Sequence, residues 1–369
     1  MTIGIIINKA WNIYNFRSSI IRHFINEGHD VVAIAPRDEY VERLEAMGCR
    51  FRDLPMSGSG VNPFSDLLLL WRIRRIIKDE KLDVLLTYTI KPNVYGSIAG
   101  RLLNTPVICN ISGLGTTFVW NNLVSKIAIF LYNVSVRKAS HVFFQNPEDM
   151  ELFLSKVPVP ENNVGLLNGS GIDLKSFSAA PKLPGKAPVF LMIGRLIIEK
   201  GAYEYAEAAQ IIKQEFPATQ FWMLGKWDQL DKRSVKQEDL DHWQEKGFIH
   251  YKGTTDDVKT MIVEADVVVL PSYREGAPRT LIEAGAMSRP LIATDVPGCR
   301  HVVSDGFNGY LCEVKSGKQL ADAIRKYLVL ENQEKLQLAK NSRIYMESNY
   351  DEKKVIIAYQ EVISSIVVK

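Results

Sequence analysis

Short apolar runs alternate with longer segments of helical pattern along the chain, and this alternation constrains the fold more than any other feature. The runs IGIIIN, VVAIA, DVLLTY and PVICNI come before residue 112, and VFLMIGR, QFWMLG, FIHYKG, ADVVVLP, PLIATD and GYLCEV come after residue 188. Continuous apolar strands separated by helices are typical of parallel βαβ units buried on both faces. The sequence therefore predicts an α/β protein built on doubly wound parallel sheets.

This pattern occurs twice, which indicates two domains. The 369 residues exceed one ordinary domain, and NGSGIDLKSFSAAPKLPGKAP interrupts the alternation with Gly, Pro and Ser. The final stretch DEKKVIIAYQEVISSIVVK has apolar residues at helical spacing and predicts a helix that covers another surface. We predict an N-terminal domain over 1–170, a linker over 171–188, a C-terminal domain over 189–348, and a last helix over 349–369 that crosses back to the N-terminal domain.

Composition excludes several classes of protein. Hydrophobic residues make up 46% and charged residues 24%, the balance of a globular protein. The formal net charge is only +3, too mild for a nucleic-acid partner. The four cysteines have no CxxC spacing and the six histidines are spread singly, so the sequence predicts neither a metal site nor a disulfide framework.

Two features bear on location. The start MTIGIIINKAWN is typical of a strand rather than a signal peptide, and no apolar run reaches the roughly 18 residues of a membrane span, so we expect a cytoplasmic protein. The segment DLLLLWRIRRIIKDEK predicts a helix, 65–80, with an apolar face and with Trp71, Arg74, Arg75 and Lys78 on another. That second face is either an ordinary solvated surface or a peripheral contact with an anionic membrane.

The stretch GRLIIEKG places two cations directly after an expected strand. Arg195 follows the strand, Lys200 comes five residues later, and Gly201 permits close backbone approach as a helix opens. A planar guanidinium and a mobile ammonium together suit a diphosphate. The alternative is that both cations are surface charges paired with Glu199 or Glu204.

The stretch SYREGAPRTLIEAGA places two carboxylates eight positions apart after the run ADVVVLP. Pro278 fits the first turn of a helix, which leaves Glu275 and Gly276 in the preceding loop and Glu283 more than a turn inside. Carboxylates accept hydrogen bonds from sugar hydroxyls, and the free amides of a helix start are donors. This pattern indicates a sugar-nucleotide site; the alternative is that Glu275 favours the helix dipole and Glu283 is solvated.

These stretches carry a family resemblance. GRLIIEKG, with ADVVVLPSYREGAPRTLIEAGAMSRPLIATDVPGCRHVVSDGFNGYLCE, resembles the donor-binding half of the retaining glycosyltransferases of family 4. Their GT-B fold has two Rossmann-like domains that face each other across a cleft. TIKPNVYGSIAGRLLNTPVI, ISGLGTTF and FFQNPEDMELF are similar to the branch that builds bacterial capsule, O-antigen and related glycans on a polyprenyl diphosphate carrier. The first loop, NKAWNIYNFRSS, departs from the glycine-rich turn of many members.

The resemblance implies a role for each candidate residue. Arg195 and Lys200 would hold the donor diphosphate, Glu283 the ribose hydroxyls, and Glu275 the hydroxyls of the transferred sugar. Thr280 and nearby backbone amides would complete a phosphate cradle. The implied catalytic residues are Glu275, Arg195 and Lys200, and the implied substrate-binding residues are Glu283, Gly276, Ala277, Thr280 and Leu281.

The resemblance also implies the reaction. A hexose or N-acetylhexosamine would pass, with retention, from a nucleotide sugar, UDP-linked by family habit, to a polyprenyl-diphosphate-linked saccharide. The leaving diphosphate would help to deprotonate the acceptor, so no side-chain base, cofactor or metal is expected. The pair in DLD, residues 239–241, is expected at the surface and not at a metal. Two alternatives stay open: a sugar-nucleotide 2-epimerase of the same fold, and a non-catalytic glycan-binding scaffold.

Overall fold

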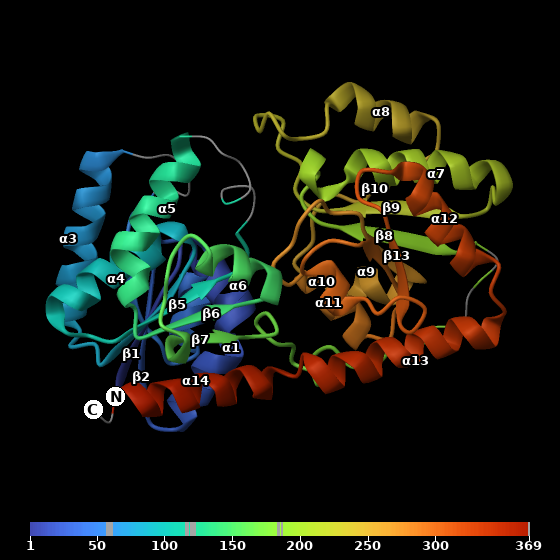
Figure 1. The fold of residues 1–369 in the computed structure, drawn as a ribbon. Coiled ribbons are helices and arrows are strands. Elements are labelled where there is room, and N and C mark those ends of the chain that lie inside the picture. Colours follow the sequence, from blue (N-terminus) through green and yellow to red (C-terminus); the bar gives the residue numbers. More distant parts are fainter. Residues whose placement is uncertain (57–61, 115–117, 119–122, 183–184, 186, 368–369) are drawn as a thin grey trace. The chain divides into compact units, whose positions relative to one another are not determined.

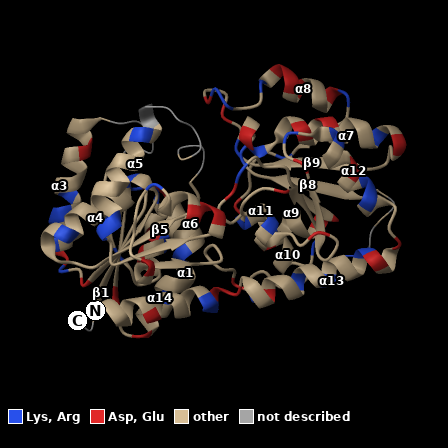
Figure 2. Cartoon of the chain, in the orientation of Figure 1, with Lys and Arg blue, Asp and Glu red and all other residues tan. Residues whose placement is uncertain are grey.

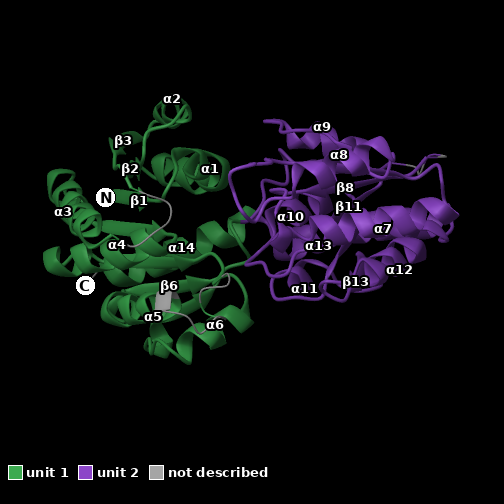
Figure 3. Cartoon of the chain, turned by 90° about the horizontal axis from the view of Figure 1, so that it is seen from above, with its two compact units in different colours: residues 1–170, 352–369 green, residues 171–351 purple. Residues whose placement is uncertain are grey.

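The computed structural model describes residues 1–56, 62–114, 118, 123–182, 185 and 187–367 (Figure 1). Residues 115–117 of ISGLGTTF, and residues 183, 184 and 186 of the expected linker, lie outside the described part. The chain divides into two compact units, residues 1–170 with 352–369 and residues 171–351 (Figure 3).

The first unit is built on a parallel sheet that has seven strands within the described residues. These strands are β1 (Thr2–Ile6), β2 (Asp30–Ala35), β3 (Arg50–Asp53), β4 (Val84–Tyr88), β5 (Val107–Ile111), β6 (His141–Phe144) and β7 (Val164–Leu166). Their order is β3-β2-β1-β4-β5-β6-β7, so the direction of winding reverses between β1 and β4. The sequence predicted the strands β1, β2, β4 and β5, and the structure adds β3, β6 and β7.

Helices cover both faces of this sheet, and the apolar core is correspondingly split in two. The helices are α1 (Ala10–Asn26), α2 (Val41–Ala46), α3 (Pro63–Asp79), α4 (Ile90–Leu103), α5 (Leu123–Ser135), α6 (Pro147–Leu154) and α14 (Glu352–Val367). Buried side chains of α1, α2 and α14 share one core cluster, and those of α3 to α6 share the other. This two-sided burial explains why the central strands are apolar without alternation.

The last helix, α14, returns to the first unit and is held there by a buried polar network. Val355, Tyr359 and Ile363, one turn apart, are buried in the same cluster as β1 and α1. The Tyr359 hydroxyl forms a 2.8 Å hydrogen bond with the Tyr88 hydroxyl and donates another to the side-chain oxygen of Asn110. Two polar side chains near the ends of β4 and β5, Tyr88 and Asn110, are therefore both hydrogen-bonded to one residue of α14.

The second unit repeats the plan with a parallel sheet that has six strands in the described chain. These strands are β8 (Val189–Ile193), β9 (Gln220–Leu224), β10 (His250–Tyr251), β11 (Val267–Leu270), β12 (Leu291–Thr294) and β13 (Gly309–Cys312). Their order is β10-β9-β8-β11-β12-β13. All six were predicted from apolar runs, and the doubly wound α/β fold predicted for both halves is confirmed.

The helices of the second unit are α7 (Ala202–Glu215), α8 (Gln237–Glu245), α9 (Val258–Glu264), α10 (Arg279–Ala286), α11 (Cys299–Val302), α12 (Gly317–Leu328) and α13 (Asn332–Asn349). Side chains of α7, α8 and α12 share one core cluster, those of α9, α10 and α11 share the other, and α13 contributes to both.

The buried network on α14 yields a stability prediction. Tyr359→Phe keeps the ring, which packs edge-on against Phe143, but leaves Tyr88 and Asn110 without their shared partner. We expect it to lower the free energy of unfolding by about 1–3 kcal/mol, measured by urea denaturation with each transition fitted separately. Ile357→Ala, on the exposed side of the same helix, should stay within about 0.5 kcal/mol of the unaltered chain. Equal effects of the two substitutions would contradict the role of the network.

Candidate active site

The candidate residues lie on loops that leave two neighbouring central strands. β8 and β11 are parallel neighbours, and the winding of the second sheet reverses between them. In open α/β sheets, ligands bind beyond the carboxyl ends of the strands at such a switch point. The loop after β8 carries Arg195 and Lys200, and the loop after β11 carries Glu275.

A close backbone approach joins these two loops. Gly201 has a φ of +75°, and a Cβ built there would lie 2.1 Å from the carbonyl oxygen of Pro271, so glycine is required. The N–H of Tyr273 donates to the carbonyl of Glu199 at 2.9 Å, and the Ser272 hydroxyl donates to the same oxygen at 3.1 Å. The two loops are therefore fixed to each other by their backbones.

Lys200 and Glu275 meet at this junction. The Lys200 ammonium donates to the Glu275 carboxylate in an ion pair whose side chains are 24% and 13% exposed. Glu204 instead accepts a 2.6 Å hydrogen bond from the Tyr273 hydroxyl. The alternative that Lys200 pairs with Glu199 or Glu204 is therefore wrong. An ammonium and a carboxylate that are both partly open to solvent are available for exchange with a ligand.

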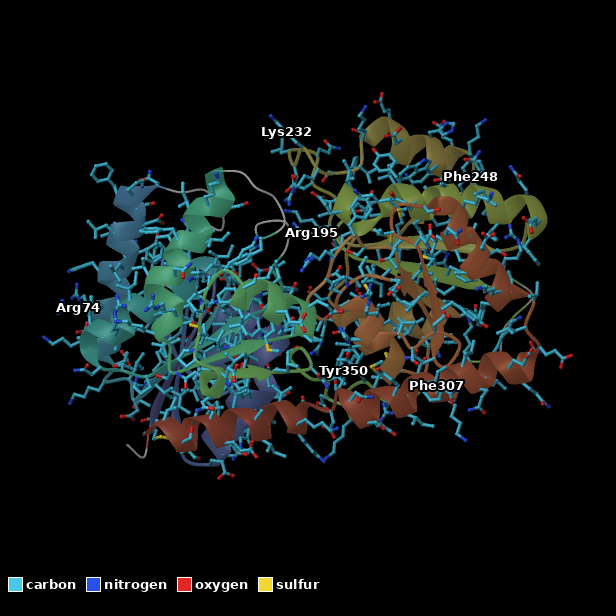
Figure 4. All side chains as sticks on the ribbon, in the orientation of Figure 1. Arg74, Arg195, Lys232, Phe248, Phe307 and Tyr350 are labelled. Atoms are coloured by element: carbon cyan, nitrogen blue, oxygen red, sulfur yellow. The ribbon has the colours of Figure 1, made fainter. Side chains whose placement is uncertain are left out.

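Arg195 is exposed and follows Gly194 at the end of β8 (Figure 4). Within the described residues it forms no ion pair with a carboxylate. The pKa of Asp231, in the loop after β9, is lowered to about 2, mainly by hydrogen bonds from Arg233. The positive charge of Arg195 makes a smaller contribution to this lowering. This guanidinium is thus a cation at the strand ends whose fork is open to a ligand.

Helix α10 holds the second carboxylate of the motif. Pro278 is the residue before the helix, not within its first turn as predicted, and α10 begins at Arg279. Glu283 is buried, which contradicts the solvated alternative. Arg279, one turn earlier, donates to its carboxylate at 2.8 Å and also to the carbonyl of Gly171. Burial raises the pKa of Glu283, and the charge and hydrogen bond of Arg279 oppose that rise.

The remaining expected residues divide into two groups. Gly276 is buried in the loop, and Ala277 and Thr280 are half-buried around the start of α10. Leu281 lies in the core with no exposed surface, and its N–H already donates to the carbonyl of Pro278 at 3.1 Å. The Thr280 side chain is therefore partly accessible to solvent at the start of α10, whereas the Leu281 side chain is not.

The sequence motifs did not indicate two residues that shape this site. Arg279 lies between the two glutamates of the motif, where its i,i+4 spacing to Glu283 was a usable signal. Gly298 has a φ of +84°, and a Cβ there would lie 2.5 Å from the carbonyl oxygen of Glu275. Because Gly298 follows a different strand, no local spacing in the sequence connects it with Glu275.

Neither a metal-binding cluster nor a membrane-spanning helix is present among the described residues. The described chain contains no group of three or more His, Cys, Asp or Glu residues that could hold a metal ion. Asp239 of the DLD stretch accepts a hydrogen bond from the Tyr203 hydroxyl at 2.7 Å on α8. None of the helices in the described part is long and apolar enough to cross a membrane.

Comparison with known proteins identifies the family. Residues 16–169 match the model of the glycosyl transferase 4-like domain, and residues 175–345 match that of glycosyl transferases group 1. These two matches cover both units in the order expected for one enzyme. The chain belongs to this glycosyltransferase group, the retaining family 4.

One relative and one solved structure match nearly the whole chain, and a second relative matches about three quarters of it. N,N'-diacetylbacillosaminyl-diphospho-undecaprenol alpha-1,3-N-acetylgalactosaminyltransferase of Campylobacter jejuni is 28% identical over 99% of this chain and 100% of its own length. UDP-Gal:alpha-D-GlcNAc-diphosphoundecaprenol alpha-1,3-galactosyltransferase of Escherichia coli is 25% identical over 73% of each chain. HepE of Anabaena, solved with UDP and glucose, is 17% identical with a TM-score of 0.81, covering 99% of this chain and 100% of its own. The GT-B fold predicted from the sequence is confirmed.

The Arg279–Glu283 pair predicts a pH dependence of stability. The raised pKa of Glu283 means that the folded state favours the protonated carboxyl. The free energy of unfolding therefore falls as the pH rises from the ordinary carboxyl pKa of 4.5 towards the higher pKa of the folded state. Arg279→Gln removes the opposing charge. We expect it to cost up to about 3 kcal/mol at neutral pH and less at mildly acidic pH, measured by thermal unfolding across that range.

Two further variants isolate the pair. Arg279→Gln combined with Glu283→Gln should lack the extra pH dependence, because no carboxyl remains to titrate at that position. Arg300→Gln, which removes an exposed partner of Asp295, should leave the pH profile unchanged. A profile for Arg279→Gln that runs parallel to that of the unaltered chain would disprove the coupling.

Proposed function

We propose that this glycosyltransferase moves a hexose or N-acetylhexosamine from a UDP-linked sugar to a polyprenyl-diphosphate-linked saccharide in surface polysaccharide biosynthesis. The observation that carries the donor part is the meeting of Lys200 and Glu275 at the strand switch point, beside Arg195. The acceptor part is supported by the printed activities of the Campylobacter and Escherichia relatives, both of which act on undecaprenyl-diphosphate-linked sugars.

The proposed chemistry needs positive charge at the donor diphosphate. Cleavage of a glycosyl phosphate bond builds negative charge on the β-phosphate while the sugar becomes oxocarbenium-like. Arg195 supplies a planar fork and Lys200 a point charge where that negative charge develops. When the diphosphate binds, it takes over the Lys200 ammonium that Glu275 holds in the free structure.

The two glutamates take separate parts of the donor. Glu275, released from Lys200, accepts hydrogen bonds from hydroxyls of the transferred sugar. Glu283, oriented by Arg279, accepts from the ribose hydroxyls. Thr280 and the backbone around Gly276 and Ala277, at the start of α10, complete the phosphate cradle. The leaving diphosphate serves as the base, so the reaction retains configuration without a catalytic side-chain base.

The two units divide the work in this proposal. Residues 189–348 form the nucleotide-sugar domain, and residues 1–170 provide the acceptor side, joined by a linker over 171–188. A lipid carrier stays in the bilayer, so the enzyme works in the cytoplasm with a peripheral contact on the inner face of the cell membrane. The contact expected from helix 65–80 corresponds to α3.

The donor site is tested by calorimetric titration of UDP and GDP without added metal. We expect UDP to bind, and Lys200→Ala to weaken binding tenfold or more, because a charge-assisted hydrogen bond contributes about 1.5–3 kcal/mol. Lys340→Ala, which removes an exposed lysine of α13, is the matched control and should bind as the unaltered chain does. Unchanged UDP binding by Lys200→Ala would overturn its diphosphate role, and binding of neither nucleotide would favour the scaffold alternative.

Transfer itself is tested with a UDP-sugar in the presence and absence of a polyprenyl-diphosphate-linked saccharide. We expect sugar to appear on the lipid fraction, and no altered sugar nucleotide to form when the acceptor is left out. Release of an epimerised UDP-sugar without acceptor would identify the 2-epimerase alternative. Lys200→Ala should slow the transfer at least tenfold, in step with its loss of nucleotide binding.

A further inference from the structure

A hollow of about 600 Å³ lies in the second unit, between the loop after β9 and the start of α8. We call it the β9–α8 hollow. Its lining runs from Trp227 on the loop to Asp241 on the helix and includes none of the residues assigned to the donor. The volume falls within the range of about 300–1,000 Å³ that is usual for small-molecule sites. The hollow is therefore large enough for a ligand of its own.

The loop on one side of the hollow is held by its backbone. The N–H of Val235 donates to the carbonyl of Leu196 at 3.0 Å, and the N–H of Ile198 donates to the carbonyl of Arg233 at 2.8 Å. Within the loop, the indole N–H of Trp227 donates to the carbonyl of Val235 at 2.8 Å. These bonds fix the wall before any ligand arrives, so a ligand spends little binding free energy on ordering the loop.

Ser234, on this wall, carries a polar group that the fold does not use. The residue is only 9% exposed, and its hydroxyl is buried without a hydrogen-bond partner in the part of the chain that the structure describes. A buried hydroxyl left unpaired lowers stability, which makes such groups rare unless a partner comes from outside the fold. Ser234 lines the hollow, and rotation between its staggered χ1 rotamers offers the hydroxyl to a ligand there.

Charges of both signs also line the hollow. Lys232 on the loop and Asp241 on α8 are exposed, and neither forms an ion pair with any described residue. The Gln229 amide donates to the Gln237 amide oxygen at 3.2 Å, between the loop and the helix. Figure 2 shows Lys and Arg beside Asp and Glu on the loop that leads into α8, and Figure 4 labels Lys232 on it.

This mixture of donors and acceptors selects the chemistry of the ligand. A phosphate only accepts hydrogen bonds and a metal ion only takes lone pairs, so each is matched by a lining of one sign. A hydroxyl group both donates and accepts, and it therefore fits a lining that offers an ammonium, a carboxylate, amides and a hydroxyl together. A compound with several hydroxyl groups suits the hollow best.

Trp227 adds an apolar surface to the same lining. Its N–H is occupied by Val235, and its ring lies edge-on to Tyr251 with 6.4 Å between the ring centroids. The ring is thus fixed in orientation and remains half-buried. One face of a pyranose ring presents mainly C–H groups, which pack on aromatic rings, while its hydroxyls point to the rim.

We propose that the β9–α8 hollow binds a saccharide, whose ring packs on Trp227 and whose hydroxyls bond to Ser234 and Asp241. Such a saccharide comes either from the glycan of the acceptor and product or from the transferred sugar of the donor. The glycan is the better source, because no residue assigned to the donor lines the hollow. This purpose rests on the proposed function, whereas binding itself depends only on the loop and α8.

The test is saturation-transfer difference NMR of the full chain with the methyl glycosides of glucose, galactose, N-acetylglucosamine and N-acetylgalactosamine. We expect at least one to bind with a dissociation constant of about 1–10 mM. Ser234→Ala and Asp241→Asn should each weaken binding about fivefold, since each removes one hydrogen bond. Glu245→Gln, which alters an exposed carboxylate of α8 outside the lining, is the matched control and should bind normally.

Two readouts separate a binding role from a structural one. Ser234→Ala should keep the thermal unfolding temperature of the unaltered chain, because its hydroxyl has no bond to lose in the fold. The glycoside should also change the tryptophan emission, and Trp227→Phe should abolish that change, whereas Trp71→Phe in the first unit should keep it. Full glycoside binding by both Ser234→Ala and Asp241→Asn would overturn the inference.

Three further arms exclude other occupants. Glu275→Gln, at the carboxylate proposed for the transferred sugar, should keep the glycoside signal, and its loss would place the sugar in the donor site and overturn the inference. Calorimetric titration that shows tighter binding of pyrophosphate than of any glycoside in the Lys200→Ala variant would identify an anion site instead. Binding of no glycoside up to about 50 mM would also overturn it. UDP titration keeps the two proposals apart: normal UDP binding without glycoside binding removes only the saccharide site.

Discussion

The close approach of Gly201 to the carbonyl oxygen of Pro271 is the constraint on which the candidate site depends. With a φ of +75° and 2.1 Å from a built Cβ to that oxygen, position 201 admits no other residue without moving the loops apart. The backbone bond from Tyr273 to Glu199 follows from the approach, and it brings Lys200 within reach of Glu275, 75 positions away in sequence. The steric constraint at Gly201 thus determines where Lys200 and Glu275 meet at the strand ends.

The two glutamates of the motif differ because their surroundings differ. The partner of Glu275 lies on another loop, and both side chains are partly open to solvent. The partner of Glu283 lies one turn away on the same helix, and that pair is tied to the backbone through Gly171. An ion pair between loops exchanges readily with an incoming ligand, whereas an i,i+4 pair inside a packed helix holds its carboxylate in place. The first arrangement suits a group that changes partner during a reaction, and the second suits a fixed hydrogen-bond acceptor.

Apolar runs predicted the strands well where both faces of the sheet are covered, as in VVVL and VFLMI. They missed both edge strands of the first sheet, where β3 reads RFRD and β7 has three residues, because an edge strand needs little apolar surface. They also missed the interior strand β6, whose apolar run HVFF is only four residues long. Motif spacing located both loops of the candidate site. It could not indicate the Lys200–Glu275 pair or the closeness of Gly298 to Glu275, since these contacts are made by the fold and not by neighbouring residues. The run LLLL likewise left the phase of α3 open, and only the packing decides that Leu69 is buried while Leu67 is exposed.

Packing of the first unit does not account for the apolar outer face of α3. Leu69, Ile73 and Ile77 already join the helix to the core, and polar residues outside would leave that contact intact. Each large apolar side chain left in water forgoes about 1.5–3 kcal/mol of transfer free energy, and single cases of this kind are common. Four on one face, followed by three cations, form a continuous surface of two chemical kinds: Phe64, Leu67, Leu68 and Trp71, then Arg74, Arg75 and Lys78.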